Sequence, residues 1–112
     1  MLPSNIELLR HIADEISFVL HSTKDKNKQI VIEDPILSRA LIRSLEIIGE
    51  ACTKLDPDFK VKNPHVEWRK MSGRNRLIHD YFGVDYDIVW DIVLYKLPNL
   101  EYNIQKIISE NS

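Results

Sequence analysis

The sequence predicts an all-α protein, an antiparallel up-down bundle of about five helices that forms one domain over residues 1–112. Three observations predict this fold class. Apolar residues recur every three or four positions over most of the chain. The chain has 3 glycines among 112 residues, which is few for a turn-rich β protein. Its prolines stand where helical patterns begin or end. This length suits one domain, and 44% hydrophobic and 29% charged residues are ordinary for a globular protein.

The first helix is expected from about Leu2 to His21, with Pro3 in its first turn. The charged stretch that follows, Ser22 to Asp34, is expected to be a loop. Ile30 to Ile32 within it is compatible with a short strand, but the sequence offers it no pairing partner. The apolar residues of the first helix fall on one stripe: Ile6, Leu9, Ala13, Ile16, Val19 and Leu20.

The second helix has a clear start, because Asp34 fits an N-cap and Pro35 the first helical position. It is expected to run to Leu55, where Pro57 removes a donor and crowds the preceding turn. Cys52 is the chain's single cysteine, so no internal disulfide forms, and we expect it to be a small buried hydrophobe. The apolar stripe is wide enough to face two neighbours: Ile36, Leu37, Ala40, Leu41, Ser44, Leu45, Ile48, Ala51, Cys52 and Leu55.

A connector over residues 57–65 is expected to lead into a third helix from about Val66 to Asp80. The charge of this region differs from that of the rest of the chain. The net charge of the protein is −2, but Lys54 to Arg76 alone carries a local charge of +4. A nearly neutral sum therefore conceals a basic stretch, which can be an RNA-binding surface or a solvated helix of mixed charge.

The last two helices are delimited by cap residues and a proline. Gly83 fits a helix C-terminal cap, and Asp85 fits the N-cap of a fourth helix from Tyr86 to Lys96. Leu97-Pro98 is expected to end that helix. A fifth helix is expected from Pro98 to about Ser109, with apolar residues at helical spacing.

Several classes of protein do not fit this sequence. It contains no apolar run of the roughly 18 residues that a membrane span needs, and its N-terminus lacks the layout of a signal peptide. We therefore expect a cytoplasmic protein with no membrane partner. The four histidines have no metal-ligand spacing, and no glycine-rich phosphate loop is present. Neither a metal nor a resident cofactor is expected.

The stretch WRKMSGRNRLIHDYFGVDYDIVW places polar groups where a small helical protein would bury carbon. Asn75 lies in the middle of an apolar stripe, His79 follows one turn later, and Arg74 and Arg76 flank Asn75. Arg74 and His79 are five residues apart, about 140° around an ideal helix. They converge only if the helix loosens, if the long arginine bends over, or if two chains meet. The stripe itself comprises Trp68, Met71, Ile78 and Phe82.

A histidine and an arginine without a metal cluster suit cleavage of an RNA phosphodiester. An imidazole titrates near neutrality and can take the proton of the 2′-hydroxyl. A guanidinium offers a permanent charge and a fork of donors to the phosphorane. Asn75 can orient the imidazole, and Tyr81 can supply a hydroxyl or stack on a base. Spacing by itself favours the plainer alternative, in which His79 packs at a helix end and the arginines lie on the surface.

The residues RNRLIHDY, from Arg74 to Tyr81, match the R-x4-H-x-Y signature of HEPN ribonucleases of the HepT type. The chain resembles the toxin half of HepT–MntA toxin–antitoxin pairs. The likeness extends to RSLEIIGEACTKL (Arg43 to Leu55) and to WRKMSGRNRLIHDYFGVDYDIVWDIV (Trp68 to Val93). Together with the helical layout it covers nearly the whole chain. The signature within these flanks is specific, and it favours the catalytic interpretation over the plainer one.

The resemblance implies an all-α HEPN bundle that works as a homodimer or a higher homo-oligomer, with the active cleft between two protomers. It implies metal-independent endonucleolytic cleavage of transfer or messenger RNA that leaves a 2′,3′-cyclic phosphate. Arg74 would stabilise the phosphate and His79 would act as general acid and base. Asn75 and Arg76 would support the cleft, and the basic stretch would bind RNA backbone.

The resemblance also implies control by a partner, as in type VII toxin–antitoxin systems. An MntA-like nucleotidyltransferase antitoxin would transfer AMP from ATP onto Tyr81, with ATP serving only as the AMP donor. The added phosphate would place bulk and negative charge in a basic cleft, where it would compete with RNA.

Two other interpretations remain open. In the first, the chain is a non-catalytic, nucleotide-binding or accessory subunit of a minimal nucleotidyltransferase, and the signature forms a nucleotide pocket. In the second, the chain is a helical interaction module in which Asn75 and His79 are structural.

Overall fold

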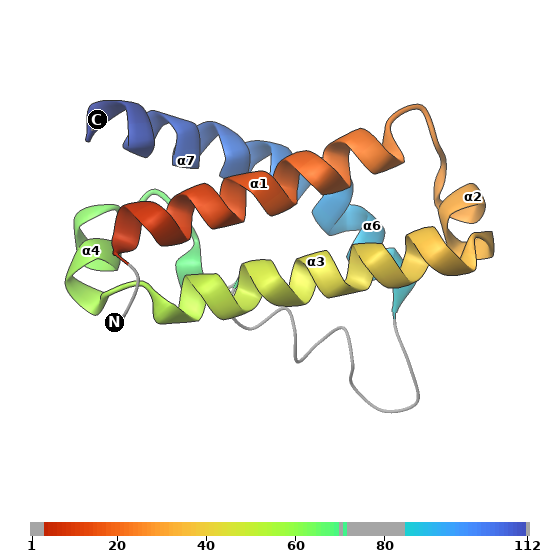
Figure 1. Ribbon diagram of the computed structural model, residues 1–112, viewed down its shortest axis with the longest axis horizontal. Coiled ribbons are helices and arrows are strands. Elements are labelled where there is room, and N and C mark those ends of the chain that lie inside the picture. Colours follow the sequence, from red (N-terminus) through yellow and green to blue (C-terminus); the bar gives the residue numbers. More distant parts are fainter. Residues whose placement is uncertain (1–3, 70, 72–84, 112) are drawn as a thin grey trace.

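A computed structural model describes residues 4–69, 71 and 85–111, and Figure 1 shows them as a bundle of helices. This part of the chain contains no strand, and the prediction of an all-α fold is confirmed. In chain order its elements are α1 (Asn5–Thr23), α2 (Lys28–Glu33), α3 (Pro35–Lys54), α4 (Pro57–Lys62), α6 (Tyr86–Asp91), the π-helical turn η1 (Ile92–Lys96) and α7 (Leu97–Glu110).

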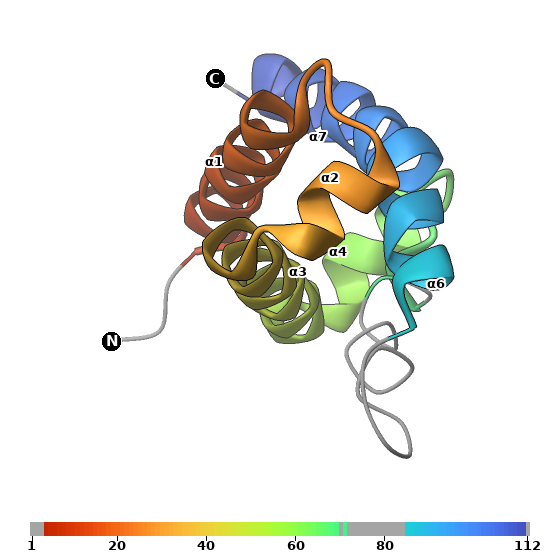
Figure 2. The same cartoon turned by 90° about the vertical axis from the view of Figure 1, so that its right-hand side faces the viewer.

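Three long helices, α1, α3 and α7, enclose the core. Figure 1 shows α1 antiparallel to α3 on one side and to α7 on the other, and both pairs pack along their lengths. The short helix α2 lies across one end of the bundle (Figure 2). The largest fully buried side chains come from all three long helices and from η1: Leu9, Ile12, Ile16, Val19, Leu41, Ile48, Leu55, Ile92, Leu97, Ile104 and Ile107. The expected stripes of these helices therefore form one shared core.

The first helix begins at Asn5 rather than at about Leu2. Ser4 has extended backbone angles, and its side chain accepts a hydrogen bond from the Glu7 amide at 3.1 Å. This N-cap satisfies one of the free amides of the first turn and sets the start of α1. Leu2 and Pro3 lie outside the described residues.

The expected loop from Ser22 to Asp34 is mostly helical, and the strand alternative at Ile30 to Ile32 is wrong. The side chain of Asn27 accepts a hydrogen bond from the Ile30 amide at 2.9 Å and so starts α2. Val31 is 1% exposed and packs into the core, whereas Ile30 is 49% exposed. Burial of one side chain against the bundle, together with a cap, thus stabilises a helix too short to form alone.

The second expected helix is confirmed as α3, with the cap that its sequence predicts. The Asp34 carboxylate accepts hydrogen bonds from the amides of Ile36 and Leu37, both at 3.0 Å, and Pro35 is the first helical residue. The expectation that Ile36 faces inward is wrong, since its side chain is 82% exposed. Cys52 is fully buried and unpaired, as expected, and burial raises the pKa of its thiol to about 12 against the lowering charge of Lys60.

The connector over residues 57–65 contains a six-residue helix, α4, which begins at Pro57 after Asp56. The Asp56 side chain does not cap this helix. It accepts a hydrogen bond from the Asn5 amide group at 3.2 Å, and the Asp56 backbone amide donates to the Asn5 side-chain oxygen at 3.1 Å. These two bonds join the start of α4 to the start of α1.

The prediction that Leu97-Pro98 separates two helices is wrong. The chain runs without a break from α6 through η1 into α7. Within η1 the Leu97 amide bonds to the Ile92 carbonyl, five residues back, instead of following the α-helical pattern. A proline inside a helix lacks a donor and crowds the carbonyl four residues earlier. The wider π turn just before Pro98 relieves that crowding and lets the helix continue.

Candidate functional site

The sequence-predicted site residues lie outside the part of the chain that the structure describes. These residues are Arg74, Asn75, Arg76, His79 and Tyr81, and the cap expected at Gly83 falls in the same segment. The structure does define the residues on either side of this segment. It therefore shows how the bundle holds the two ends of the signature-bearing stretch.

We call residues 72–84, which contain the signature, the signature segment, and the described residues Trp68 and Met71 before it the entry. An aromatic contact fixes this entry. The helix there begins at Trp68, two residues later than the expected Val66. The Trp68 indole N–H donates to the Asn63 carbonyl at 3.0 Å, and its ring centroid lies 6.0 Å from that of Phe59. Trp68 is 5% and Met71 6% exposed, which confirms the inward face predicted for these two residues. A large apolar ring and one satisfied donor therefore anchor the entry in the core.

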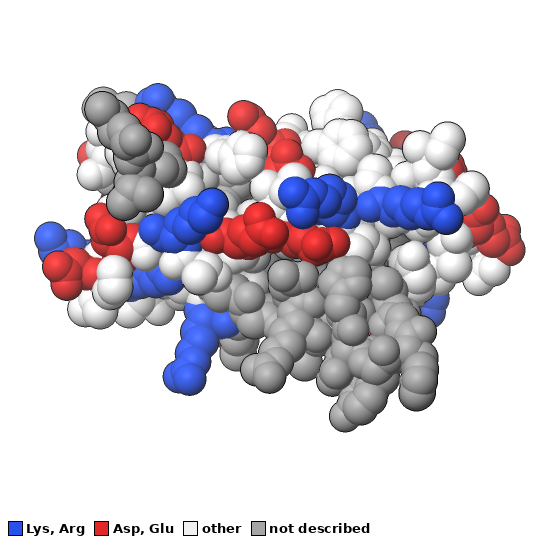
Figure 3. Space-filling view, turned by 60° about the horizontal axis from the view of Figure 1, so that its bottom comes forward, with Lys and Arg blue, Asp and Glu red and all other residues white. Residues whose placement is uncertain are grey.

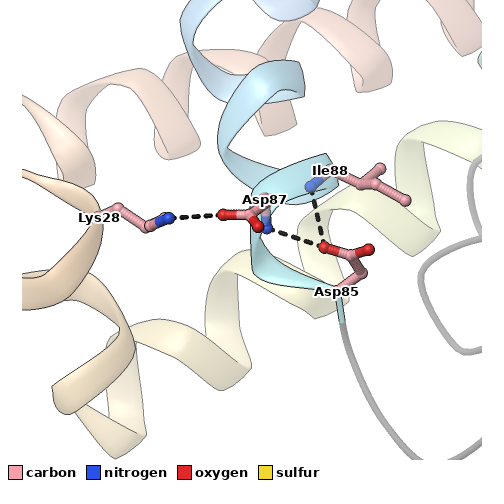
Figure 4. Close-up of polar contacts among 4 residues, drawn as sticks. All are labelled: Lys28, Asp85, Asp87 and Ile88. Carbon is pink, nitrogen blue, oxygen red and sulfur yellow. Dashed lines mark hydrogen bonds and ion pairs between the residues drawn. The ribbon is translucent and has the colours of Figure 1, made fainter.

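We call Asp85 and the first turn of α6, which follow the signature segment, the exit. A polar N-cap fixes this exit (Figure 4). The Asp85 carboxylate accepts hydrogen bonds from the amides of Asp87 at 3.0 Å and Ile88 at 3.3 Å, which confirms Asp85 as the predicted N-cap. The Asp87 carboxylate in turn pairs with the Lys28 ammonium group of α2. The pair is exposed, at 41% for the Lys28 and 82% for the Asp87 side chain. It links the exit to an element far away in the sequence.

A small hollow of about 30 Å³ lies between the entry and the helix formed by η1 and α7. Met71, Val66 and Leu100 supply apolar walls, while the side chains of Lys96, Asn99 and Asn103 supply polar ones on successive turns. Glu67 completes the lining. This hollow was not predicted from the sequence. The available signal was the spacing of Lys96, Asn99 and Asn103, which puts three polar residues on one helical side.

The charged side chains of the described surface are largely of mixed sign. Figure 3 shows neighbouring basic and acidic groups along one face of the molecule. On α3, a guanidinium nitrogen of Arg43 lies 3.8 Å from a carboxylate oxygen of Glu46 and 3.8 Å from one of Glu50. In the stretch predicted to be basic, Lys54, Lys62 and Arg69 are exposed. Exposed cations therefore run from the last turn of α3 to the residues just before the signature.

The described residues offer neither a metal-binding cluster nor a membrane-spanning helix. No group of three or more histidine, cysteine, aspartate or glutamate side chains there is placed to hold a metal ion. No helix among them is both long enough and apolar enough to span a membrane.

Comparison with known proteins places this chain in a family of ribonucleases. The family model described as "Ribonuclease HepT-like" matches residues 6–107. The chain therefore belongs to the HepT-like ribonuclease family, and the prediction of an endoribonuclease is confirmed at the level of the family.

Individual relatives agree with this family. "Putative RNase TTE0752" of Caldanaerobacter subterraneus subsp. tengcongensis is 41% identical over 91% of this chain and 92% of its own length. "Putative RNase MJ0127" of Methanocaldococcus jannaschii is 42% identical over 93% of this chain and 84% of its own. "Probable ribonuclease HepT" of Thermococcus cleftensis is 36% identical over 96% of this chain and 98% of its own. The comparison with solved structures gave no match.

Proposed function

We propose that this protein is the toxin of a type VII toxin–antitoxin system, a metal-independent endoribonuclease of the cytoplasm that cleaves transfer or messenger RNA. One observation carries the proposal. The HepT-like ribonuclease match spans residues 6–107 and so includes the R-x4-H-x-Y signature from Arg74 to Tyr81.

The chemistry assigned to the signature balances without a cofactor. His79 takes the proton of the ribose 2′-hydroxyl as its oxygen attacks the adjacent phosphorus. Arg74 donates to the phosphorane oxygens as negative charge develops on them. The bond to the 5′-oxygen breaks, an imidazolium returns a proton to that oxygen, and the products are a 2′,3′-cyclic phosphate and a 5′-hydroxyl. Asn75 and Arg76 support the cleft.

A homodimer, or a higher homo-oligomer built from it, is part of the proposal. An ideal helix separates Arg74 and His79 by about 140° around its axis, so a regular helix with extended side chains in one protomer does not bring both groups to one phosphate. Two signature segments that face each other remove this difficulty. The described residues on the two sides of the segment are fixed in place, Trp68 in the core and Asp85 as an N-cap.

The proposed control is transfer of AMP from ATP to the Tyr81 hydroxyl by an MntA-like nucleotidyltransferase antitoxin. Tyr81 is two residues beyond His79, so an adenylate there brings a negative phosphate close to the general base. That charge and bulk compete with RNA for the basic cleft.

The direct test uses the purified full-length chain, a labelled total tRNA pool and EDTA throughout. Wild type is compared with Arg74→Ala and His79→Ala, and circular dichroism confirms that all three are folded. We expect cleavage by wild type alone, with cyclic phosphate ends. If folded wild type cleaves neither transfer nor messenger RNA and instead binds ATP saturably, the proposal is overturned in favour of an accessory subunit of a nucleotidyltransferase.

A further inference from the structure

The outer side of η1 and α7 carries an aromatic and polar stripe. We call Tyr95, Asn99, Tyr102 and Lys106 the α7 stripe. Their spacing of four, three and four residues puts them on one side of a helix. Tyr95 is 66% and Tyr102 69% exposed. The opposite side of the same helix is buried and apolar, with Leu97, Leu100, Ile104 and Ile107 each at most 3% exposed.

The π turn of η1 contributes to this exposure. One turn with a five-residue hydrogen bond shifts the residues that precede it around the helix axis, relative to an unbroken α-helix. Leu94, at 49% exposed, and Tyr95 lie within that turn. Single π turns occur frequently at functional sites. Here a large aromatic side chain, Tyr95, lies mostly in solvent within such a turn.

The α7 stripe is continuous with the hollow beside the signature segment. Asn99 belongs to both, and the hollow continues along the helix through Lys96 and Asn103. Its far wall includes Met71, three residues before Arg74. A chain-like ligand lying along α7 therefore passes directly to the entry of the signature segment.

The side chains of this surface match single-stranded RNA. Tyrosine rings stack on unpaired bases, and such stacking tolerates any sequence. The amides of Asn99 and Asn103 offer both donors and acceptors to base edges, and Lys96 and Lys106 offer positive charge to phosphates. The four residues of the α7 stripe include no carboxylate. Glu67 lines the adjoining hollow, and the exposed Asp91 and Glu110 lie four residues before Tyr95 and four after Lys106. Apart from Leu94 the surface lacks the exposed aliphatic side chains that a protein interface core needs.

We propose that the α7 stripe and the adjoining hollow form an accessory site for single-stranded RNA, which holds nucleotides flanking the cleaved bond. The inference rests on the proposed function in that the ligand is the RNA substrate. Tyr95 and Tyr102 are seven residues apart, about 10 Å along the helix axis, so the two rings stack on different bases. The site then favours cleavage in unpaired segments over duplexes.

The test measures binding by fluorescence anisotropy, using His79→Ala full-length protein as the background so that RNA stays intact. The probes are a labelled single-stranded oligonucleotide and the same strand in a duplex. The double variant Tyr95→Ala/Tyr102→Ala is expected to weaken single-strand binding at least tenfold, since base stacking on one aromatic ring contributes about 1–3 kcal/mol. Tyr95→Phe/Tyr102→Phe keeps the rings and is expected to retain most of the affinity. The matched control is Phe18→Ala, which removes an aromatic ring that is 46% exposed on α1.

A second variant separates charge from stacking. Lys106→Ala is expected to lower the slope of log Kd against log salt by about one unit, without the loss of single-strand preference that the tyrosine variants cause. Equal affinities of the alanine double variant and Phe18→Ala would overturn the site while leaving RNA cleavage intact. A change of oligomeric state in sedimentation that accounts for the lost affinity would overturn it too, and would assign the stripe to a protein interface. Absence of RNA binding by the His79→Ala protein, together with absence of cleavage by wild type, would overturn both proposals.

Discussion

The two ends of the signature segment are held by different kinds of interaction. The entry depends on Trp68, a buried ring with one satisfied donor that packs against Phe59 and the core. The exit depends on the exposed Asp85 cap and on the Lys28–Asp87 pair. Burial of apolar area is insensitive to salt, whereas exposed charges are screened by it. Loss of the contacts at the entry should therefore lower the free energy of unfolding strongly. Loss of the contacts at the exit should lower it only slightly.

The largest effect is expected from Trp68→Ala. Loss of the buried ring leaves a cavity and leaves the Asn63 carbonyl without its indole donor, so the free energy of unfolding should fall by about 3–5 kcal/mol. Urea unfolding followed by circular dichroism measures this loss. Trp68→Phe keeps most of the ring and should lose much less. A fall below about 1 kcal/mol for Trp68→Ala would show that the entry is not an anchor.

The apolar interior should also disfavour ionisation of the buried Cys52 thiol. Its pKa is raised to about 12 in the folded chain from 9.0, so above pH 9 the unfolded state loses a proton that the folded state keeps. The stabilisation that results from this raised pKa is fully present below pH 9 and is lost as the pH rises toward 12. By pH 10 the loss is on the order of 1 kcal/mol.

The measurement for Cys52 is urea unfolding at pH 8 and pH 10, with Cys52→Ala as the control that removes this one titration. A thiol reagent should label Cys52 in urea but not in the native protein. Rapid labelling of the folded chain at pH 8 would contradict the burial.

At the exit, Asp85→Ala is expected to destabilise by about 1 kcal/mol, because the amides of Asp87 and Ile88 lose their acceptor. Asp85→Asn and Asp85→Ser keep an acceptor and should recover most of the loss. Thermal unfolding of the three variants provides the comparison. Equal midpoints for the alanine and serine variants would mean that the cap does not stabilise α6.

The smallest effect is expected from Lys28→Met, which removes the exposed pair with Asp87. Such pairs contribute about 0.2–1 kcal/mol at most, and the contribution should fade in high salt. A double-mutant cycle with Asp87→Asn at low and high salt isolates the coupling. A coupling free energy that is unchanged in high salt would show that the exit, like the entry, is stabilised by contacts that salt does not screen.

Some helix starts were predictable from a cap residue and its partner amides a few positions later, but the starts after Ser4 and Asn27 were missed. Asp34 with Pro35, and Asp85, set helix starts that the structure confirms. The start at Ser4 was missed because Pro3 one residue earlier offers a competing first turn. The catalytic candidates from Arg74 to Tyr81 were recognisable only as a signature, and their placement remains a prediction. The hollow at Lys96, Asn99 and Asn103 was not predicted, because its other wall comes from a different part of the chain.

The sequence by itself determined the all-α class, the family and the helix starts after Asp34 and Asp85, because these depend on periodicity, a motif and caps within a few residues. The tertiary structure decided what depends on distant neighbours. Ile30 to Ile32 is helical because Val31 buries its side chain in the bundle. The chain continues as a helix through Pro98 because η1 widens by one π turn while Ile92 and Leu97 stay in the core. Free energy gained by burying a side chain depends on what covers it, and only the assembled bundle supplies that cover.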